Sequence, residues 1–212
     1  MDVRKALRFL GYALHRTGTF GLSCEHTFSR FGMYLGIERL CRNRVFDGPA
    51  FSVSHSRHLL SFMSLRRGIE VTDADYPQVN LLNLPYGDNT FGVVVSDQVF
   101  EYIKGSPIQA FAESLRVLKP GGWVLHTTCF LTPYHGPGDY WRFSPEGLEE
   151  LAKMSGASEA HAGGHGHPGE FIINLLGWRW LPVPKASWHP FRKLASLNRV
   201  SYQTTVWVLA RK

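Results

Sequence analysis

Acidic side chains follow a short segment of this chain that is expected to form a strand. Asp73 and Asp75 follow residues 69–72, and a polar segment at residues 96–98 follows the apolar run 91–95. A carboxylate only accepts hydrogen bonds, so Asp73 and Asp75 are suited to the hydroxyl groups of a ligand. These positions predict the binding of a polar small molecule.

A second group of candidate residues lies in one Pro- and Gly-rich loop. His135 titrates near neutrality, which suits the abstraction of a proton. Tyr140, Trp141 and Arg142 can bind an anionic or sugar substrate by stacking and by bidentate hydrogen bonds. A structural interpretation stays open beside the functional one. His135 or Arg142 can instead hold the loop to Asp139, and Trp141 can anchor the loop to the core.

The spacing of cysteines and histidines does not favour a metal site. The three cysteines are scattered without a CxxC pair: Cys24, Cys41 and Cys129. His161, His165 and His167 have glycine-rich neighbours and no cysteine or acid at a defined spacing. We therefore expect reduced thiols and no metal.

The elements that must position these residues alternate between strands and helices from residue 68 to residue 156. Helical patterns begin at Ser106-Pro107 and at Ser144-Pro145, and each pattern ends at glycine. The expected strands cover residues 69–72, 91–95, 123–128 and 204–210. This order predicts an α/β fold, a Rossmann-like, doubly wound and mostly parallel sheet with helices on both faces.

Composition fits one globular domain with charged ends. The chain has 212 residues, of which 44% are hydrophobic and 19% charged, enough for a full core. Residues 1–44 carry eight Lys or Arg and three Asp or Glu, residues 45–170 carry eight and fourteen, and residues 171–212 carry seven and none. No apolar run of membrane-spanning length and no secretory signal is visible, so we expect a cytoplasmic protein.

Three sequence blocks resemble a known family. They are Leu84 to Phe91, Val93 to Glu101 and Arg116 to Gly122. In this order and spacing they resemble the class I S-adenosylmethionine-dependent methyltransferases of the small-molecule, type 11-like kind. The loop from Pro133 to Pro145 is similar to a block in a subgroup linked to surface glycan or glycolipid synthesis, which is an analogy at the level of the fold.

The resemblance implies S-adenosyl-L-methionine as cofactor and assigns residues to it. Asp75, or else Asp73, accepts from the ribose hydroxyls, Asn80 faces the adenine, and Leu81 flanks the ring unless it is plain core. Segment 96–98 cradles the methionine part. The assigned cofactor residues are Asp47, Gly48, Asp73, Asp75, Asn80, Leu81, Ser96, Asp97 and Gln98.

The glycine-rich motif of the family is degenerate here. Its best counterpart is Val45 to Ala50, expected to supply the first strand and its loop, with Gly48 where the family usually has three glycines. Ser54 or Ser56 is then expected to cap the first helix. The loss of glycines leaves a non-catalytic scaffold subunit with the methyltransferase fold as an alternative.

The resemblance also implies how the reaction proceeds. Methyl transfer needs an in-line approach and, for a hydroxyl acceptor, one base. His135, in the loop that roofs the family's substrate pocket, is the expected base, and Tyr140, Trp141 and Arg142 are expected to hold a sugar or a lipid-linked glycan. An RNA methyltransferase is a further alternative, although no appended RNA-binding module is visible.

The two ends of the chain suggest an anionic partner. We divide the chain into a basic N-terminal helical segment, residues 1–44, and a methyltransferase domain, residues 45–212. An amphipathic helix within residues 1–20 and the tryptophan-rich basic segment 177–193 are typical of membrane interfaces. We expect peripheral binding to the inner face of an anionic membrane. Nucleic acid is the less favoured partner, and the oligomeric state is left open.

Overall fold

The computed structural model describes residues 3–212, with side chains described from residue 5 onward. Its centre is a six-stranded sheet in the order β5-β3-β6-β7-β10-β8. The strands are β3 (Ala50–Val53), β5 (Val71–Ala74), β6 (Phe91–Asp97), β7 (Leu118–Cys129), β8 (Glu159–His165) and β10 (Thr205–Arg211). The first four in spatial order run parallel, whereas β10 is antiparallel to both β7 and β8. The carboxyl ends of the parallel strands therefore meet at one edge of the sheet.

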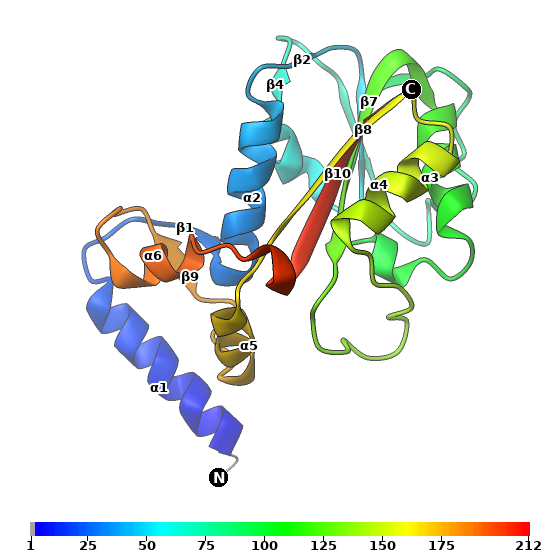
Figure 1. The fold of residues 1–212 in the computed structure, drawn as a ribbon. Helices are drawn as coiled ribbons and strands as arrows, with labels where there is room; N and C mark the ends of the chain where they lie inside the picture. Colours follow the sequence, from blue (N-terminus) through cyan, green and yellow to red (C-terminus); the bar gives the residue numbers. More distant parts are fainter. Residues whose placement is uncertain (1–2) are drawn as a thin grey trace.

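Helices cover both faces of this sheet (Figure 1). On one face lie α3 (Pro107–Arg116) and α4 (Pro145–Met154), whose apolar residues close a core around Phe100 and Phe111. On the other face lie α2 (Phe28–Cys41) and the 3₁₀ helix η1 (Ser56–Phe62), around Ile37 and Leu59. The doubly wound α/β fold expected from the sequence is confirmed.

Helix starts follow the expected signals. Ser106 and Ser144 accept hydrogen bonds from the amides of Gln109 (3.3 Å) and Gly147 (3.1 Å), and a proline follows each cap. The expected strand 123–128 is longer than predicted. It begins at Leu118, so the Pro-Gly-Gly segment lies inside β7, beside a shift in its register with β6.

The expected first strand is wrong. Val45–Phe46 forms β2, which pairs with β4 (Ser64–Leu65) in a separate small sheet, and the strand of the central sheet is β3. Asp47 and Gly48 precede β3, so they lie at the amino edge of the sheet. The Asp47 carbonyl passes so close to Gly92 that a Cβ there would lie 1.8 Å from it. Residue 92 must therefore be glycine.

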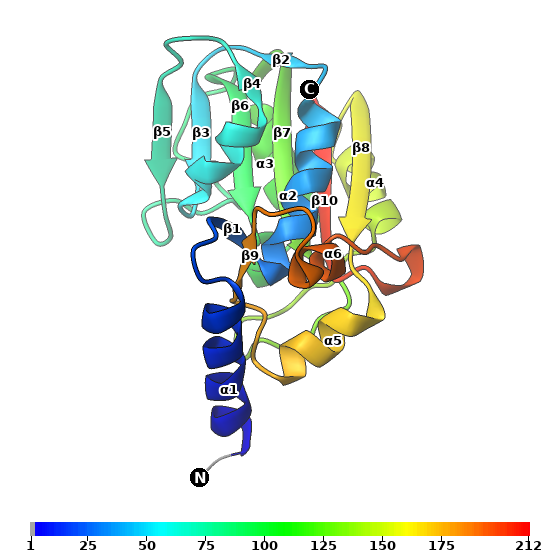
Figure 2. The ribbon, with the colours of Figure 1, turned by 90° about the vertical axis from the view of Figure 1, so that its left-hand side faces the viewer.

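The remaining elements form a layer at the carboxyl edge, which we call the cap (Figure 2). It comprises α1 (Val3–Gly18), β1 (Cys24–Thr27), α5 (Pro168–Leu175), β9 (Pro182–Pro184) and α6 (Pro190–Ala195). Strands β1 and β9 pair antiparallel, and a third core joins Phe28 and Phe31 of α2 to Ile173 and Val183 of the cap. Two 3₁₀ turns, η2 (Phe100–Tyr102) and η3 (Val200–Tyr202), complete the described chain. No helix in the described part is long and apolar enough to cross a bilayer.

Candidate cofactor and acceptor site

The loop after β3 turns without glycine. Ser54 and His55 both adopt left-handed backbone, with φ of 54° and 58°. Left-handed backbone costs roughly 1–2 kcal/mol per non-glycine residue. Ser56 stabilises the turn, because its hydroxyl donates to the Val53 carbonyl (2.5 Å) and accepts from the Asp97 amide (2.7 Å). The loop thus keeps a tight turn at the carboxyl edge with polar side chains in place of glycines.

His55 lies between the two acids at the end of β5. Its Nδ1 is 3.6 Å from Asp73 and its Nε2 is 3.2 Å from Asp75. A hydrogen bond from the Ser54 side chain and one from the Tyr76 amide lower the pKa of Asp75. The Asp75 side chain is 40% exposed, so its ionised carboxylate is open to a ligand. The structure therefore brings Asp73 and Asp75 to the predicted edge, together with a histidine that the sequence did not single out.

Asp97 ends β6 and is almost fully bonded inside the protein. Its carboxylate accepts from Tyr34 Oη (2.8 Å), from His58 Nε2 (2.9 Å) and from Thr127 Oγ1 (2.5 Å). Burial disfavours its charge, but the hydrogen bond from His58, the charge of Arg30 and the hydrogen bonds from Thr127 and Tyr34 prevail and lower its pKa to about 2. Asp97 is thus a fixed anion that organises the end of β6, and it is too weak a base to take a proton.

The two neighbours of Asp97 in the chain, Ser96 and Gln98, differ in burial. The Ser96 hydroxyl is fully buried and lies 2.7 Å from His126 Nδ1 inside the sheet, so this side chain points away from the edge where the cofactor is expected. Gln98 has left-handed backbone, and both its backbone N–H (3.0 Å) and its side-chain Nε2 (3.3 Å) donate to Thr127 Oγ1. Gln98 therefore lies at the edge with Asp97.

The two residues assigned to the adenine, Asn80 and Leu81, also differ in burial. Asn80 is exposed, and its Oδ1 accepts from the Leu82 amide at 2.9 Å. Leu81 is only 3% exposed and packs in the core below α3, which is the structural alternative and corrects its assignment to the cofactor. Asp47 and Gly48 are likewise removed from the site, because they lie at the opposite edge of the sheet.

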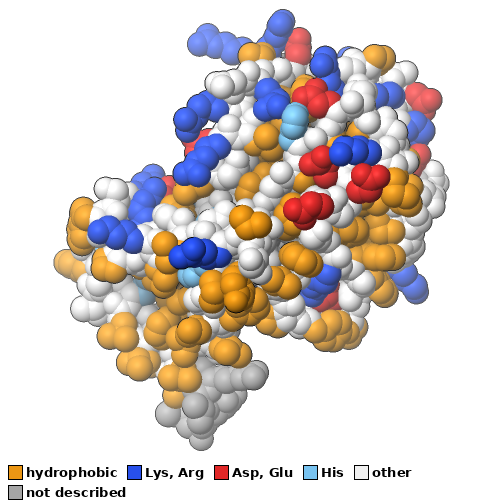
Figure 3. Space-filling view, in the orientation of Figure 1, with side chains coloured by type: hydrophobic (Ala, Val, Ile, Leu, Met, Phe, Trp, Pro, Cys, Tyr) orange, Lys and Arg blue, Asp and Glu red, His pale blue; other side chains and the backbone are white. Residues whose placement is uncertain are grey.

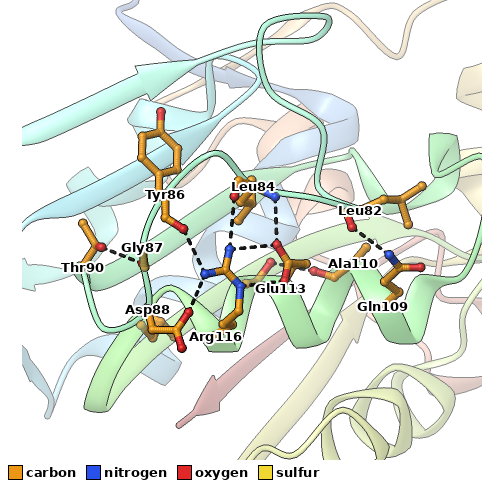
Figure 4. Close-up of polar contacts among 12 residues, drawn as sticks. Leu82, Leu84, Tyr86, Gly87, Asp88, Thr90, Gln109, Ala110, Glu113 and Arg116 are labelled. Carbon is orange, nitrogen blue, oxygen red and sulfur yellow. Dashed lines mark hydrogen bonds and ion pairs between the residues drawn. The ribbon is translucent and has the colours of Figure 1, made fainter.

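A network centred on Arg116 fixes the segment between Asn80 and β6 (Figure 4). The Arg116 guanidinium on α3 binds Glu113 (2.7 Å) and Asp88 (2.6 Å) and donates to the carbonyls of Leu84 and Tyr86. Glu113 in turn accepts from the Leu84 amide at 2.8 Å. The first and third sequence blocks are thereby tied together, which gives their resemblance a structural reason.

The loop after β7 is held by its own residues. Arg142 pairs with the Asp139 carboxylate, which also accepts from the His135 amide (2.8 Å). Trp141 Nε1 donates to the Ile103 carbonyl (2.8 Å). For Trp141 and Arg142 the structure thus shows the anchoring alternative. Tyr140 is 52% exposed and remains accessible.

His135 sits in this loop near the end of β7. Its Nδ1 is 3.5 Å from Tyr102 Oη. Burial and the positive charge of Arg179 lower its pKa, which keeps the ring neutral at neutral pH. Cys129, His135 and Asp139 converge with donor atoms within 4.8 Å. This set does not suit a cation, because Asp139 already carries Arg142 and burial raises the pKa of the Cys129 thiol to about 11.

The three histidines for which the sequence analysis considered a metal site each have a structural contact of their own. His161 lies 2.6 Å from Glu159, buried His165 lies 3.1 Å from the Ala195 carbonyl, and His167 caps α5 by accepting from the Gly169 amide.

Two buried acids escaped the sequence analysis as site residues. Glu101 is 1% exposed, accepts from Thr128 (2.8 Å), and burial raises its pKa to about 7. Glu170 of the cap accepts from Thr204, and burial raises its pKa to about 7 as well. Glu101 stands in a matched block and could have been found from it. Glu170 could not, because its place depends on how the cap packs.

Comparison with known proteins agrees with this arrangement. A family model described as a methyltransferase domain matches residues 46–126. No curated protein sequence matches the chain. A phosphoethanolamine N-methyltransferase from Haemonchus contortus, solved with S-adenosyl-L-methionine, has a TM-score of 0.53 at 17% identity, covering 85% of this chain and 52% of that one. The chain thus spans about half the length of that protein.

In two bacterial structures the match covers nearly the whole length of the other chain. A methyltransferase from Mesorhizobium loti has a TM-score of 0.50 at 11% identity, over 84% of this chain and 96% of that one. One from Bacillus halodurans has a TM-score of 0.50 at 10% identity, over 84% of this chain and 98% of that one. At such identities these neighbours establish the fold. Residues 46–126 are therefore similar in sequence to a methyltransferase domain, and the chain shares its fold with solved S-adenosylmethionine-dependent methyltransferases.

Proposed function

We propose that this protein transfers the methyl group of S-adenosylmethionine to a hydroxyl or similar nucleophile of a small molecule. The observation that carries the proposal is the set of polar side chains at the carboxyl edge. Asp73 and Asp75 lie at the end of β5, Asp97 ends β6, which β3 separates from β5, and the loop with His135 follows β7. Ligands of doubly wound sheets bind at this edge.

The residues present fit the cofactor. Asp75 offers an exposed, ionised carboxylate for the two ribose hydroxyls. The turn at Ser54 and His55 keeps the left-handed backbone that glycines provide elsewhere, and the His55 side chain is 79% exposed, so it is free to move aside. Asp97 and Gln98 then face the amino-acid part. When bound, S-adenosylmethionine supplies an electrophilic methyl group.

His135 acts as the base in this proposal. Its Nδ1 faces Tyr102 Oη, which leaves Nε2 as the atom that takes the acceptor's proton. The lowered pKa of His135 keeps the ring neutral at neutral pH, and in the tautomer whose Nδ1–H faces Tyr102 Oη the free Nε2 can act as a base. Tyr140 lines the acceptor side, while Trp141 and Arg142 hold the loop in place.

Titration calorimetry with S-adenosylhomocysteine tests the proposal. We expect binding in the micromolar range by folded protein, with a rise in melting temperature. Folded protein that shows neither heat nor thermal shift at millimolar ligand would support the scaffold alternative instead.

The proposed acceptor is a sugar or a lipid-linked glycan, and the proposed place of the reaction is an anionic membrane surface. Hydrophobic side chains gather at the end of the molecule that carries the cap (Figure 3). On and near α1, Phe9 is 77%, Leu14 is 58% and Phe20 is 90% exposed, and Trp188 of the cap is 64% exposed. Lys5 and Arg8 of α1 line a hollow together with Pro133, Asn174 and Leu175. Exposed apolar side chains and basic side chains on one helix favour an anionic bilayer as the occupant.

A further inference from the structure

Two arginines meet beneath the cap without a counter-ion. Arg30 lies in the first turn of α2, and Arg179 lies between α5 and β9. The Ser29 amide donates to the Arg179 carbonyl (3.1 Å), which holds the two segments side by side. Within the described part of the chain, neither guanidinium has an acid within 4.0 Å.

Each guanidinium group also has a buried donor nitrogen that has no hydrogen-bond partner in the described chain. These atoms are Arg30 Nη1 and Arg179 Nε. A buried, unpaired cationic donor is costly, and native proteins rarely keep one without a partner. Burial, and then the charge of Arg30, lower the pKa of Arg179, so the two cations are close enough to repel each other. The pair therefore favours an anion from outside the chain.

The acids nearby do not satisfy this pair. Asp97 is bonded to Tyr34, His58 and Thr127. Burial raises the pKa values of Glu101 and Glu170 to about 7, and in the described chain neither carboxylate lies within 4.0 Å of either guanidinium. None of these three acids therefore pairs with Arg30 or Arg179.

The position of Arg179 favours the acceptor, and not the cofactor, as the source of the anion. The proposed cofactor residues lie at the ends of β5, β3 and β6. Arg179 interacts electrostatically with Cys129 at the end of β7 and with Tyr102 of η2, and both arginines act on His135. Arg179 therefore lies toward β7, on the side of the proposed base, whereas Arg30 acts on both His135 and Asp97 and lies between the two parts of the site.

We propose that Arg30 and Arg179 bind an anionic group of the acceptor, a phosphate or a carboxylate, beside His135. The inference rests on the proposed function and narrows its substrate class. Guanidinium groups match such anions through paired hydrogen bonds. The Trp180 ring, 4.9 Å from the Arg179 guanidinium, holds that side chain in orientation. An anionic acceptor anchored here would present its nucleophile to His135.

Calorimetry on protein saturated with S-adenosylhomocysteine tests the inference, with inorganic phosphate and acetate as probes. We expect millimolar phosphate binding that Arg30→Gln and Arg179→Gln each weaken at least about tenfold. Arg67→Gln, an exposed arginine outside the site, is the matched control and should bind as the parent does. Because each substitution removes an unpaired buried cation, neither variant should melt below the parent in phosphate-free buffer. Absent phosphate binding, or binding that survives both substitutions, would overturn the inference.

A second arm separates the acceptor's anion from the carboxylate of the cofactor. 5′-Methylthioadenosine lacks the amino-acid part of the cofactor. If the variants weaken S-adenosylhomocysteine but not methylthioadenosine, and leave phosphate binding unchanged, the arginines serve the cofactor and the inference is wrong. If S-adenosylhomocysteine does not bind to the folded parent, the proposed function fails, and phosphate titration of the ligand-free protein still tests the arginine pair.

Discussion

The imidazole of His55 lies 3.2 Å from the carboxylate of Asp75, at the position where the ribose hydroxyls of the cofactor are expected. The same ring lies 3.6 Å from Asp73. A ligand that bonds to Asp75 must therefore share its carboxylate with His55 or displace the ring. Since His55 also has left-handed backbone, its side chain imposes a conformational cost at this turn.

His55→Gly should strengthen S-adenosylhomocysteine binding several-fold, because it frees Asp75 and relaxes the turn. Asp75→Asn should weaken binding at least about tenfold by removing a charged acceptor. Asp73→Asn should have the smaller effect if Asp75 is the ribose ligand. Calorimetry on the three variants measures these differences, and weaker binding by His55→Gly would show that His55 itself contacts the cofactor.

His135→Ala should lower turnover about a hundredfold while leaving affinity for S-adenosylhomocysteine nearly unchanged. Burial and the Arg179 charge lower the pKa of His135 below its ordinary value of 6.5. Activity should therefore persist through neutral pH and fall only under acidic conditions, where the ring becomes protonated. The measurement is a pH–rate profile with saturating cofactor.

Glu101→Gln is the contrasting variant in that experiment. If Glu101 were the base, the rate of the parent would decline below pH 7, where its carboxylate becomes protonated. The Gln variant would then be nearly inactive. We expect instead a variant that keeps most of its turnover and the acidic limb set by His135.

Burial of Glu101 should also show in the pH dependence of stability. Its pKa rises from 4.5 to about 7 in the folded protein, so between these values the folded state binds more protons than the unfolded state. The free energy of unfolding should therefore fall as pH rises through this window. Glu101→Gln should gain about 1–3 kcal/mol on the parent between pH 5 and pH 8. Urea unfolding at several pH values measures it, and parallel curves for both proteins would contradict the assignment.

The sequence predicted the parts of this fold whose signals are local. The helix caps at Ser106 and Ser144 and the buried run of β6 each depend on neighbouring residues, and the structure has them where expected. The turn at Ser54 and His55 was missed because left-handed backbone in non-glycine residues leaves no clear sequence signal.

The arginine pair was missed for a different reason. Arg30 and Arg179 are far apart in the sequence, and the pairing of β1 with β9 brings their segments together. That pairing involves short strands with prolines at both ends of β9, a pattern that does not predict a strand. The buried charges of the cap therefore could not be derived before its packing was known.

The apolar end of the cap carries the last prediction, binding to anionic bilayers. Phe9 and Phe20 are 77% and 90% exposed, and no described part of the chain covers them. Transfer of such side chains into a bilayer interface is favourable, and Lys5 and Arg8 nearby add attraction to anionic lipid. We expect the protein to float with phosphatidylglycerol vesicles more than with phosphatidylcholine vesicles, and less as salt increases. The double variant Phe9→Ser/Phe20→Ser should lose at least about tenfold in vesicle affinity. Met154→Ser, which changes a side chain that is 62% exposed on α4 outside the cap, is the control and should float as the parent does. Equal binding to both vesicle types, or a double variant that floats unchanged, would show that the exposed apolar residues of α1 serve another contact.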